Sequence, residues 1–399
     1  MGGNSLFFSH YTDWVYLQID FPVDRIVHRI LGHPDLALSI KPVHTTIDPQ
    51  IRDLSPTVRE WFWEAVDTLP YSYESGQPIW YRPYAHVEMS QYKTWDEIAQ
   101  KFYPLYALSL DFSQSVPSEM QAVVDQWKQS SACSLKRALQ ALRFVQDEIR
   151  YLGIEEGMGA FQPTDPRLTF QRRFGDCKDK AFLLHALLQL MGIRSTPLLV
   201  HTCKGAIIPH MLPTPYAFNH LVLQLEIGGQ HYWVDPTLSL QGGSLSTSFF
   251  PNYKWGLLLS NHSEGLIALP QVHVHNPTEI ATSFNVASEE KTYLQMTSVF
   301  YAGQADRLRR SLEWNGVQKI ADDALSDMQE LYGEVSWEAP LEVVDDREGN
   351  SLTLVESYSF PTRQYSGVMV SYTFRDYLHR QINPERASRV SVAHAHVDN

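Results

Sequence analysis

The chain has 399 residues, of which 44% are apolar and 19% charged, and its formal net charge at pH 7 is −13. A chain of this length exceeds one ordinary hydrophobic core, so we expect two or three domains. Its excess of acidic residues, with no Lys/Arg-rich run, argues against nucleic acid or an anionic membrane as a partner. The sequence contains no run of ~18 consecutive apolar residues, so we predict no transmembrane helix.

Residues 1–90 favour a mostly β structure, because they are rich in Tyr, Trp and Pro and contain short apolar alternations such as residues 14–19. We expect one helix in this part, near residues 56–66. A Thr-Trp-Asp-Glu capping box at residues 94–97 predicts the start of the next helix.

Apolar residues at helical spacing predict another helix after Ser134. The side chains expected to face inward are Leu135, Ala138, Leu139, Leu142, Val145 and Ile149, and those expected to face outward are Lys136, Arg143 and Gln146. Such a stripe is typical of a helix that packs on a core with one side.

Cys177 lies at the predicted first turn of a buried helix that continues through the apolar residues 182–191. Asp176 precedes it as an N-cap, and Asp179 stands where the acid of a capping box belongs. Amide groups and the helix dipole at this end favour a thiolate over a thiol, and two nearby lysines add positive charge. Cys177 is therefore a candidate nucleophile, although a packed core cysteine would fit the same local pattern.

A β-hairpin is predicted around the Gly-Gly pair at residues 228–229, between strands at residues 219–225 and 231–236. If the two glycines form the loop, His220 and Asp235 are diagonal neighbours on one face, about 7–8 Å apart. An imidazole and a carboxylate can reach each other at that separation, so the hairpin supplies a base and an orienting acid. An ordinary strand histidine and a strand-ending aspartate are the competing interpretations.

Three motifs, in this order, resemble the transglutaminase-like superfamily: Gly-Asp-Cys-Lys-Asp-Lys-Ala (residues 175–181), Phe-Asn-His-Leu-Val (218–222) and Tyr-Trp-Val-Asp-Pro-Thr (232–237). More narrowly, the chain is similar to bacterial proteins that pair this core with an N-terminal DUF3857 domain. The resemblance covers about residues 130–240 and includes the runs at residues 151–157 and 161–163. It implies an α+β, papain-like cysteine core in which Cys177 is the nucleophile, His220 the base and Asp235 the orienter.

The expected organisation is an N-terminal β-rich, partly DUF3857-like domain over residues 1–90, a catalytic core over 91–260, and a C-terminal α+β accessory domain over 275–399. In the last domain we predict strands at 282–286, 292–301, 341–344 and 351–359, with helices at 305–312 and 317–332 separated by Asn315-Gly316. The polar tail after about residue 386 is expected to fray.

The backbone amide of Cys177 is the expected donor to a developing oxyanion. Gln171, six residues before the cysteine, has the spacing of the papain-like glutamine, but a structural role is favoured because transglutaminase relatives often draw this donor from elsewhere. Gln162 and Tyr151 are further candidates. His185 lies about 12 Å along the helix from Cys177, so it is not the base.

The spacing of His201, Cys203 and His210 matches no standard structural zinc site, so we expect no metal and no cofactor. Glu155 and Glu156 are adjacent, and adjacent strand residues point to opposite faces, which makes them poor candidates for a shared acid–base site. The three cysteines provide no disulfide framework.

These residues predict thiol-dependent acyl transfer on a protein or peptide substrate, at a glutamine or another amide. Whether lysine or water resolves the thioester, which separates a transglutaminase from a peptidase or amidase, stays open. The alternatives are a catalytically silent transglutaminase-like binding or scaffold module and a zinc amidase. The first residues lack a signal-peptide pattern, so a cytoplasmic location is expected as the sequence stands, and a periplasmic or exported one if the N-terminus is truncated.

Overall fold

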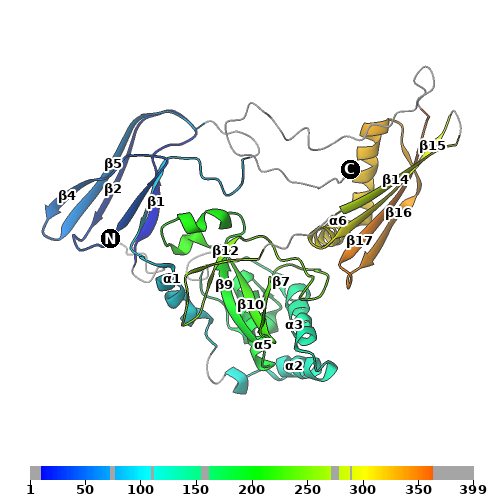
Figure 1. Cartoon of the computed structure of the whole chain (residues 1–399), viewed down its shortest axis with the longest axis horizontal. Helices are drawn as coiled ribbons and strands as arrows, with labels where there is room; N and C mark the ends of the chain where they lie inside the picture. Colours follow the sequence, from blue (N-terminus) through cyan, green and yellow to red (C-terminus); the bar gives the residue numbers. More distant parts are fainter. Residues whose placement is uncertain are drawn as a thin grey trace.

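The computed structural model describes residues 10–71, 77–108, 112–153, 161–270, 278–287 and 290–362. Figure 1 shows N-terminal strands, a central core of helices and sheet, and a C-terminal sheet with one long helix. This arrangement confirms the predicted α+β fold class. Across the described segments, no helix combines the length and apolar character that a membrane crossing requires.

The N-terminal part contains two antiparallel three-stranded sheets, with strand orders β1-β6-β3 and β2-β5-β4. Their strands are β1 Thr12–Tyr16, β2 Val23–Gly32, β3 Ser39–Val43, β4 Gln50–Ser55, β5 Val58–Thr68 and β6 His86–Ser90. The helix expected near residues 56–66 is wrong, because β5 occupies this segment. Trp61, Trp63 and Ala65 are buried at alternate positions, which is the period of a strand, and aromatic residues favour strands.

The central part is built around a five-stranded sheet of order β11-β10-β9-β12-β13. Its strands are β9 Arg194–Val200, β10 His220–Ile227, β11 Gln230–Val234, β12 Trp255–Leu258 and β13 Leu266–Ala268; β7 Arg150–Tyr151 and β8 Phe174–Gly175 form a separate parallel pair. The helices are α1 Trp95–Phe102, α2 Ser118–Ser130, α3 Ser134–Glu148, α4 Pro166–Arg172 and α5 Cys177–Leu190.

Helix α5 is buried on nearly all sides because it packs on β9 and β10 and also contacts α3 and α4. Fully buried residues such as Leu183, Leu184 and Leu187 anchor it. Burial of each leucine side chain contributes about 1.5–3 kcal/mol, so the start of α5 is held in a fixed place.

Helix α3 confirms the predicted amphipathic stripe, with Ala138, Leu142 and Val145 buried. The outward placement of Gln146 is wrong, because its side chain is only 2% exposed. The side-chain amide of Gln146 has hydrogen-bond partners inside the protein, which offset the cost of removing this polar group from water.

The β10–β11 hairpin has the predicted register, with pairs running from Leu223↔Val234 to Ile227↔Gln230. Gly228 and Gly229 form its two-residue loop with φ of +61° and +76°. A type I′ turn requires positive φ at both central residues, which explains the Gly-Gly pair.

The C-terminal part is an antiparallel sheet of order β14-β15-β17-β16, packed against helix α6. Its elements are β14 Thr278–Val286, β15 Thr292–Tyr301, α6 Gly303–Tyr332, β16 Ser336–Asp346 and β17 Ser351–Phe360. The predicted strands and the predicted helix break are confirmed, since Gly316 has non-helical dihedral angles inside α6. The tail expected to fray lies outside the described residues.

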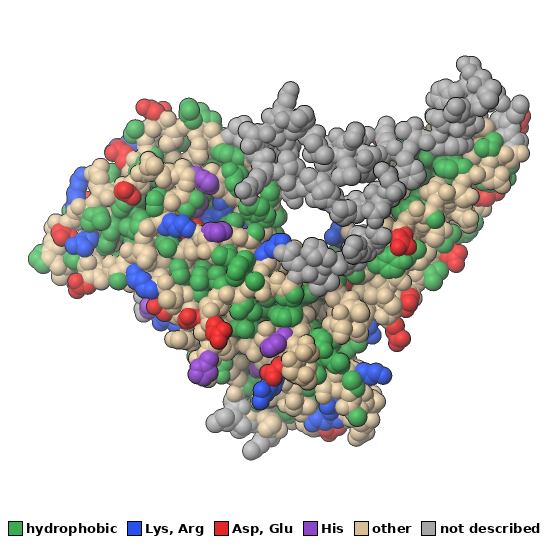
Figure 2. All heavy atoms as spheres, viewed as in Figure 1, with side chains coloured by type: hydrophobic (Ala, Val, Ile, Leu, Met, Phe, Trp, Pro, Cys, Tyr) green, Lys and Arg blue, Asp and Glu red, His purple; other side chains and the backbone are tan. Residues whose placement is uncertain are grey.

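Hydrogen bonds join the core to both flanking parts. The Glu88 carboxylate of β6 accepts from the amide of Leu212 at 2.9 Å, and Arg347 forms an ion pair with Asp147 at 2.5 Å. Figure 2 shows basic and acidic side chains interspersed on the visible face, with hydrophobic side chains between them.

Candidate active site

The N-terminus of α5 carries the capping box that the sequence predicts. The Asp176 carboxylate accepts hydrogen bonds from the amides of Lys178 and Asp179, and the Asp179 carboxylate accepts from the amide of Asp176. These reciprocal bonds fix the first turn and the position of Cys177, whose side chain is 7% exposed.

The charged residues around this turn are buried and paired. The Nζ of Lys178 contacts the Asp176 carboxylate at 2.7 Å, and Arg172 contacts Asp179 at 2.6 Å. The Nζ of Lys180 donates instead to the main-chain carbonyls of Gln146 and Ile149. Burial lowers the pKa of Lys180 to about 8, although Asp235 and Asp147 oppose this shift. Lys178 and Lys180 therefore stabilise the local structure and also place positive charge near Cys177.

The hairpin brings His220 and Asp235 into direct contact. The imidazole Nε2 lies 2.9 Å from the Asp235 Oδ2, and the two residues are 9% and 2% exposed. His220 opens β10, and Asp235 immediately follows β11. The diagonal arrangement expected from the hairpin register is therefore present.

Two further residues hold the Asp235 carboxylate. Thr237 donates to Oδ1 through its amide at 2.8 Å and its hydroxyl at 2.7 Å. The Tyr253 hydroxyl donates to Oδ2 at 2.5 Å, and its ring centroid lies 5.7 Å from that of His220. The sequence could have indicated the role of Thr237, which belongs to the Asp-Pro-Thr motif. Nothing in the sequence indicated that Tyr253, 18 residues beyond Asp235, would contact the carboxylate.

The contact changes how both partners titrate. Burial opposes a charged imidazole, but the charge and hydrogen bond of Asp235, with a hydrogen bond from Cys177, raise the pKa of His220 to about 10. Burial also opposes a charged carboxylate, but His220, Tyr253 and Thr237 lower the pKa of Asp235 well below its usual value. The site therefore favours an imidazolium–carboxylate pair.

Cys177 lies close to this pair, since its hydrogen-bonding and charge are among the causes of the raised pKa of His220. Since Nε2 is bonded to Asp235, the remaining ring nitrogen, Nδ1, is the one available to sulfur. Tyr106 also lies close: burial and then the charges of Cys177, Asp176 and Asp179 raise its pKa well above its usual value, and its hydroxyl donates to the Phe161 carbonyl.

The predicted oxyanion donors lie on different elements of the core. Gln171 is on α4 and Gln162 is in the segment before α4; both are solvent-exposed, as is Tyr151 on β7. Among the described residues, the Cys177 amide has no hydrogen-bond acceptor, while the next two amides donate to Asp176. A free first-turn amide is the donor that a thiol acyl-transfer site requires. Residues 155–156 lie outside the described residues.

Within the described segments, no group of three or more His, Cys, Asp or Glu residues has the geometry to hold a metal ion. The Nδ1 of His201 accepts hydrogen bonds from the amides of Cys203 and Lys204, both at 3.0 Å. This nitrogen is thus engaged by the main chain. The surroundings of His201 and Cys203 therefore offer no support for a zinc site there.

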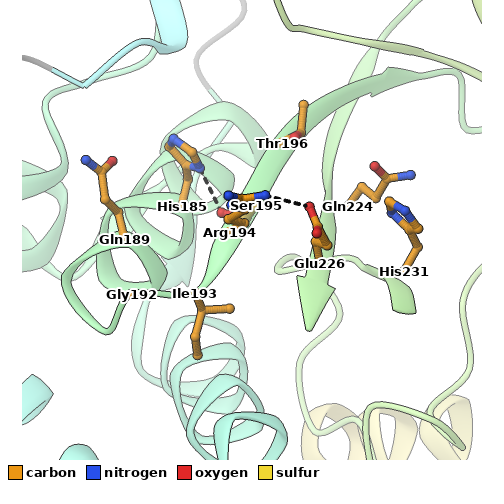
Figure 3. Close-up of a pocket in the computed structure, with 10 residues that line it drawn as sticks. All are labelled: His185, Gln189, Gly192, Ile193, Arg194, Ser195, Thr196, Gln224, Glu226 and His231. Carbon is orange, nitrogen blue, oxygen red and sulfur yellow. Dashed lines mark hydrogen bonds and ion pairs between the residues drawn. The ribbon is translucent and has the colours of Figure 1, made fainter. Parts of the chain in front are cut away.

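A cavity of about 430 Å³ lies at the other end of α5. Figure 3 shows His185 bonded to Ser195 at 2.8 Å and Arg194 paired with Glu226 at 3.5 Å on its wall. His185 is eight residues along α5 from Cys177, about 12 Å away, so this cavity is separate from the cysteine site.

No protein-family model and no curated protein matches the sequence. The chain is similar to a solved structure from Parabacteroides distasonis described as a "putative protease", with 11% identity, a TM-score of 0.51, and coverage of 88% of this chain and 69% of that one. This likeness shows a shared fold.

Two other solved structures are similar at lower scores. A "putative cysteine protease" from Cytophaga hutchinsonii has 16% identity, a TM-score of 0.26 and coverage of 57% of this chain and 74% of that one. The periplasmic domain of TgpA from Pseudomonas aeruginosa has 13% identity, a TM-score of 0.23 and coverage of 55% and 72%. At these scores neither carries an argument about this chain.

Proposed function

We propose that the chain is a transglutaminase-like thiol enzyme that transfers acyl groups from amide bonds of a protein or peptide substrate. In this proposal Cys177 is the nucleophile, His220 the base and Asp235 the orienter. The observation that supports it best is the buried His220–Asp235 pair, which lies close to Cys177 at a capped helix start.

Before substrate binds, the proton of the Cys177 Sγ has already passed to the Nδ1 of His220, so the resting site holds a thiolate and an imidazolium. The thiolate attacks the amide carbonyl, and the Cys177 amide donates to the developing oxyanion. The carbon–nitrogen bond then breaks as the imidazolium gives its proton to the leaving ammonia or amine, and a thioester remains. Asp235 stabilises the imidazolium throughout.

The thioester is resolved by water or by an amine, with His220 taking the proton of the incoming nucleophile. Water gives a peptidase or amidase, and a lysine amine gives a cross-linking transglutaminase. Gln171 and Gln162 are proposed as additional oxyanion donors, to be brought closer by bound substrate. The N-terminal sheets are proposed as the DUF3857-like domain of the resemblance.

Turnover assays test the proposal and separate its two branches. Glutaminyl peptides and peptide amides are incubated with the full chain, with and without a fluorescent primary amine, while ammonia release, new peptide termini and amine incorporation are followed. We expect activity in the wild type and its loss in both Cys177→Ala and His220→Ala. Activity that survives in Cys177→Ala would contradict the proposed nucleophile.

A further inference from the structure

The main chain at Asp235 is held by a side chain that the triad does not include. The Gln146 Nε2, on α3, donates to the Asp235 carbonyl at 2.9 Å. Asp235 follows the last ladder residue of β11 and precedes a proline, so the sheet does not continue to hold it. Thr237 and Tyr253 hold the carboxylate. The carbonyl of Asp235 accepts from Gln146 at 2.9 Å and, at the longer distance of 3.4 Å, from the amide of Leu238, so Gln146 gives the shorter contact to the main chain that carries the carboxylate.

A second glutamine fixes the orientation of the first. The Gln146 Nε2 also donates to the Gln241 Oε1 at 2.9 Å, and the Gln241 Nε2 donates to the Phe249 carbonyl at 2.6 Å. Both ends of this chain of bonds are main-chain carbonyls, which only accept. The direction of both amides is therefore determined, and Gln146 can only donate to Asp235.

Gln146 also touches the helix that carries the cysteine. Its main-chain carbonyl accepts from the Nζ of Lys180 at 3.2 Å, one turn after Cys177 on α5. Gln146, near the end of α3, thus contacts both parts of the site. Its main-chain carbonyl contacts α5, which carries Cys177, and its side-chain amide contacts the main chain at Asp235.

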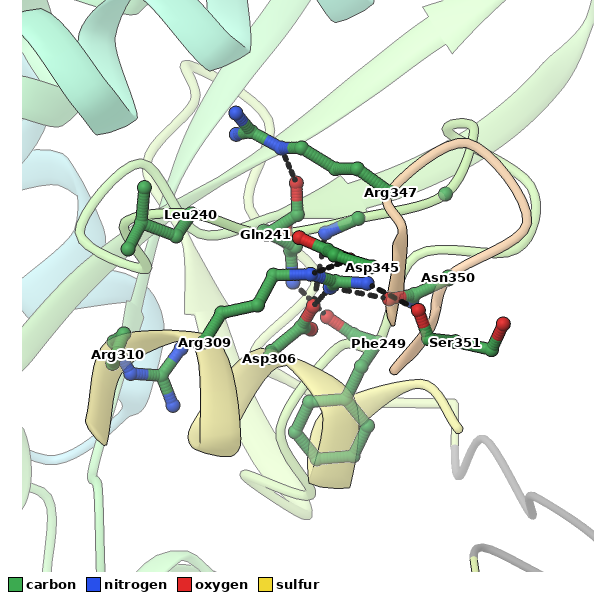
Figure 4. Close-up of polar contacts among 12 residues, drawn as sticks. Leu240, Gln241, Phe249, Asp306, Arg309, Arg310, Asp345, Arg347, Asn350 and Ser351 are labelled. Atoms are coloured by element: carbon green, nitrogen blue, oxygen red, sulfur yellow. Dashed lines mark hydrogen bonds and ion pairs between the residues drawn. The ribbon is translucent and has the colours of Figure 1, made fainter. Parts of the chain in front are cut away.

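Arg347 and Asp306 of the C-terminal part lie beside Gln241 (Figure 4). The Arg347 Nε donates to the Gln241 carbonyl at 3.1 Å, and the amide of Gly242 donates to the buried Asp306 at 2.9 Å. A Cβ on Gly242 would lie 2.4 Å from the Asn350 Oδ1 and 2.8 Å from the Arg347 carbonyl, so the contact is too close for any other residue without a shift. The segment between Asp235 and Tyr253 is therefore clamped by the C-terminal part.

We propose that Gln146 is a positioning residue of the Cys177 site, which fixes the main chain of Asp235 and, through Gln241, links the triad to the C-terminal part of the chain. This inference rests on the proposed function for its effect on chemistry, but the hydrogen bonds that carry it exist whichever reaction the site performs. If the main chain at Asp235 were not fixed, its carboxylate would no longer hold the imidazole of His220 in the orientation that faces the Cys177 thiol.

The test compares Gln146→Met with Gln140→Met, its match on the same helix, whose side chain bonds only to Ser130 among the described contacts. Methionine keeps the length of glutamine but cannot donate a hydrogen bond. Both variants are made in a Cys133→Ser, Cys203→Ser background, and Cys177 is alkylated with iodoacetamide. Separately, the Nε2 proton and the ring nitrogens of His220 are followed by NMR in chains labelled with ¹⁵N-histidine.

We expect Gln146→Met to slow alkylation about 10–100-fold and to shift the His220 Nε2 signal, because small misplacements of a catalytic group can cost about 100-fold. Gln140→Met should change neither. A folded Gln146→Met chain with wild-type alkylation and a wild-type His220 signal would overturn the proposal. If Gln146→Met does not fold, Gln241→Met, which removes one of the two acceptors, is judged by the same criteria.

The two hypotheses fail differently. If wild-type Cys177 shows no enhanced reactivity, the proposed function fails, and the His220 signal alone then decides whether Gln146 positions Asp235. If Cys177 is reactive but Gln146→Met behaves like Gln140→Met in both measurements, only the positioning role is lost.

Discussion

Replacing Tyr253 with phenylalanine should remove one hydrogen bond from Asp235 while leaving the ring in place. The hydroxyl donates to the same Oδ2 that contacts His220, and Asp235 is fully enclosed. The ring itself packs edge-on against Phe250, with centroids 5.4 Å apart, and phenylalanine preserves this contact. The change therefore isolates the hydroxyl.

A hydrogen bond to a buried charged group contributes about 1.5–3 kcal/mol. If the predicted core unfolds as one unit of roughly 150–250 residues, each 1 kcal/mol lowers Tm by roughly 2–4 °C, so we expect a fall of about 3–12 °C. Thermal unfolding of the full chain, followed by tryptophan fluorescence and circular dichroism, measures this shift.

The matched control is Tyr84→Phe, because the Tyr84 hydroxyl bonds to Asp20 at an exposed site. Exposed charged contacts contribute about 0–1 kcal/mol, so its Tm should change little. If Tyr253→Phe shifts Tm no more than Tyr84→Phe does, Asp235 does not depend on Tyr253 and the described burial of the carboxylate is wrong.

Three other outcomes follow from the site. The charge of Asp235 outweighs the effect of burial and raises the pKa of His220 to about 10, so the pair's contribution to the free energy of unfolding is fully present below about pH 6.5 and is lost as the pH rises toward 10. Denaturant unfolding at pH 6 and pH 9.5 should show this loss of stability. The His220→Gln chain should not show the part of the loss that comes from this pair. Asp235→Asn should lower turnover by about 10⁴-fold while Cys177 still labels slowly; turnover within tenfold of wild type would rule out the orienting role. Treatment with EDTA should leave turnover unchanged, and a loss reversed by zinc would favour the zinc amidase instead.

Local patterns predicted the parts of the site that lie close together in the sequence. The capping box needs only Asp176 and Asp179, and the hairpin register needs only the Gly-Gly pair, so both could be read from adjacent residues. The contact between His220 and Asp235 followed from that register. The helix break at Gly316 was predictable for the same reason.

The remaining features depend on contacts between distant segments. Gln146 has the helical position of a solvent-facing residue, and only the approach of Gln241, 95 positions later, makes its burial favourable. Tyr253 reaches Asp235 through a long connection with no periodic signal. In β5, the apolar residues at positions 61–63 were compatible with either a helix or a strand, and pairing with β2 and β4 determined the outcome.

The alkylation rate of Cys177 decides whether this cysteine is an activated nucleophile. The comparison must exclude Cys133, which is exposed at the start of α3 and whose pKa is lowered by the backbone amides of Lys136 and Leu135. The measurement is therefore intact mass over time in a Cys133→Ser, Cys203→Ser chain treated with iodoacetamide at neutral pH.

We expect one adduct that forms faster than on a free cysteine peptide and is absent from the Cys177→Ala chain. It should form at least tenfold more slowly in His220→Ala, since a paired imidazolium favours the reactive thiolate. An adduct that forms no faster than on the peptide, with the same rate in the His220→Ala chain, would show that the three residues do not act together and would leave the binding or scaffold role as the better account.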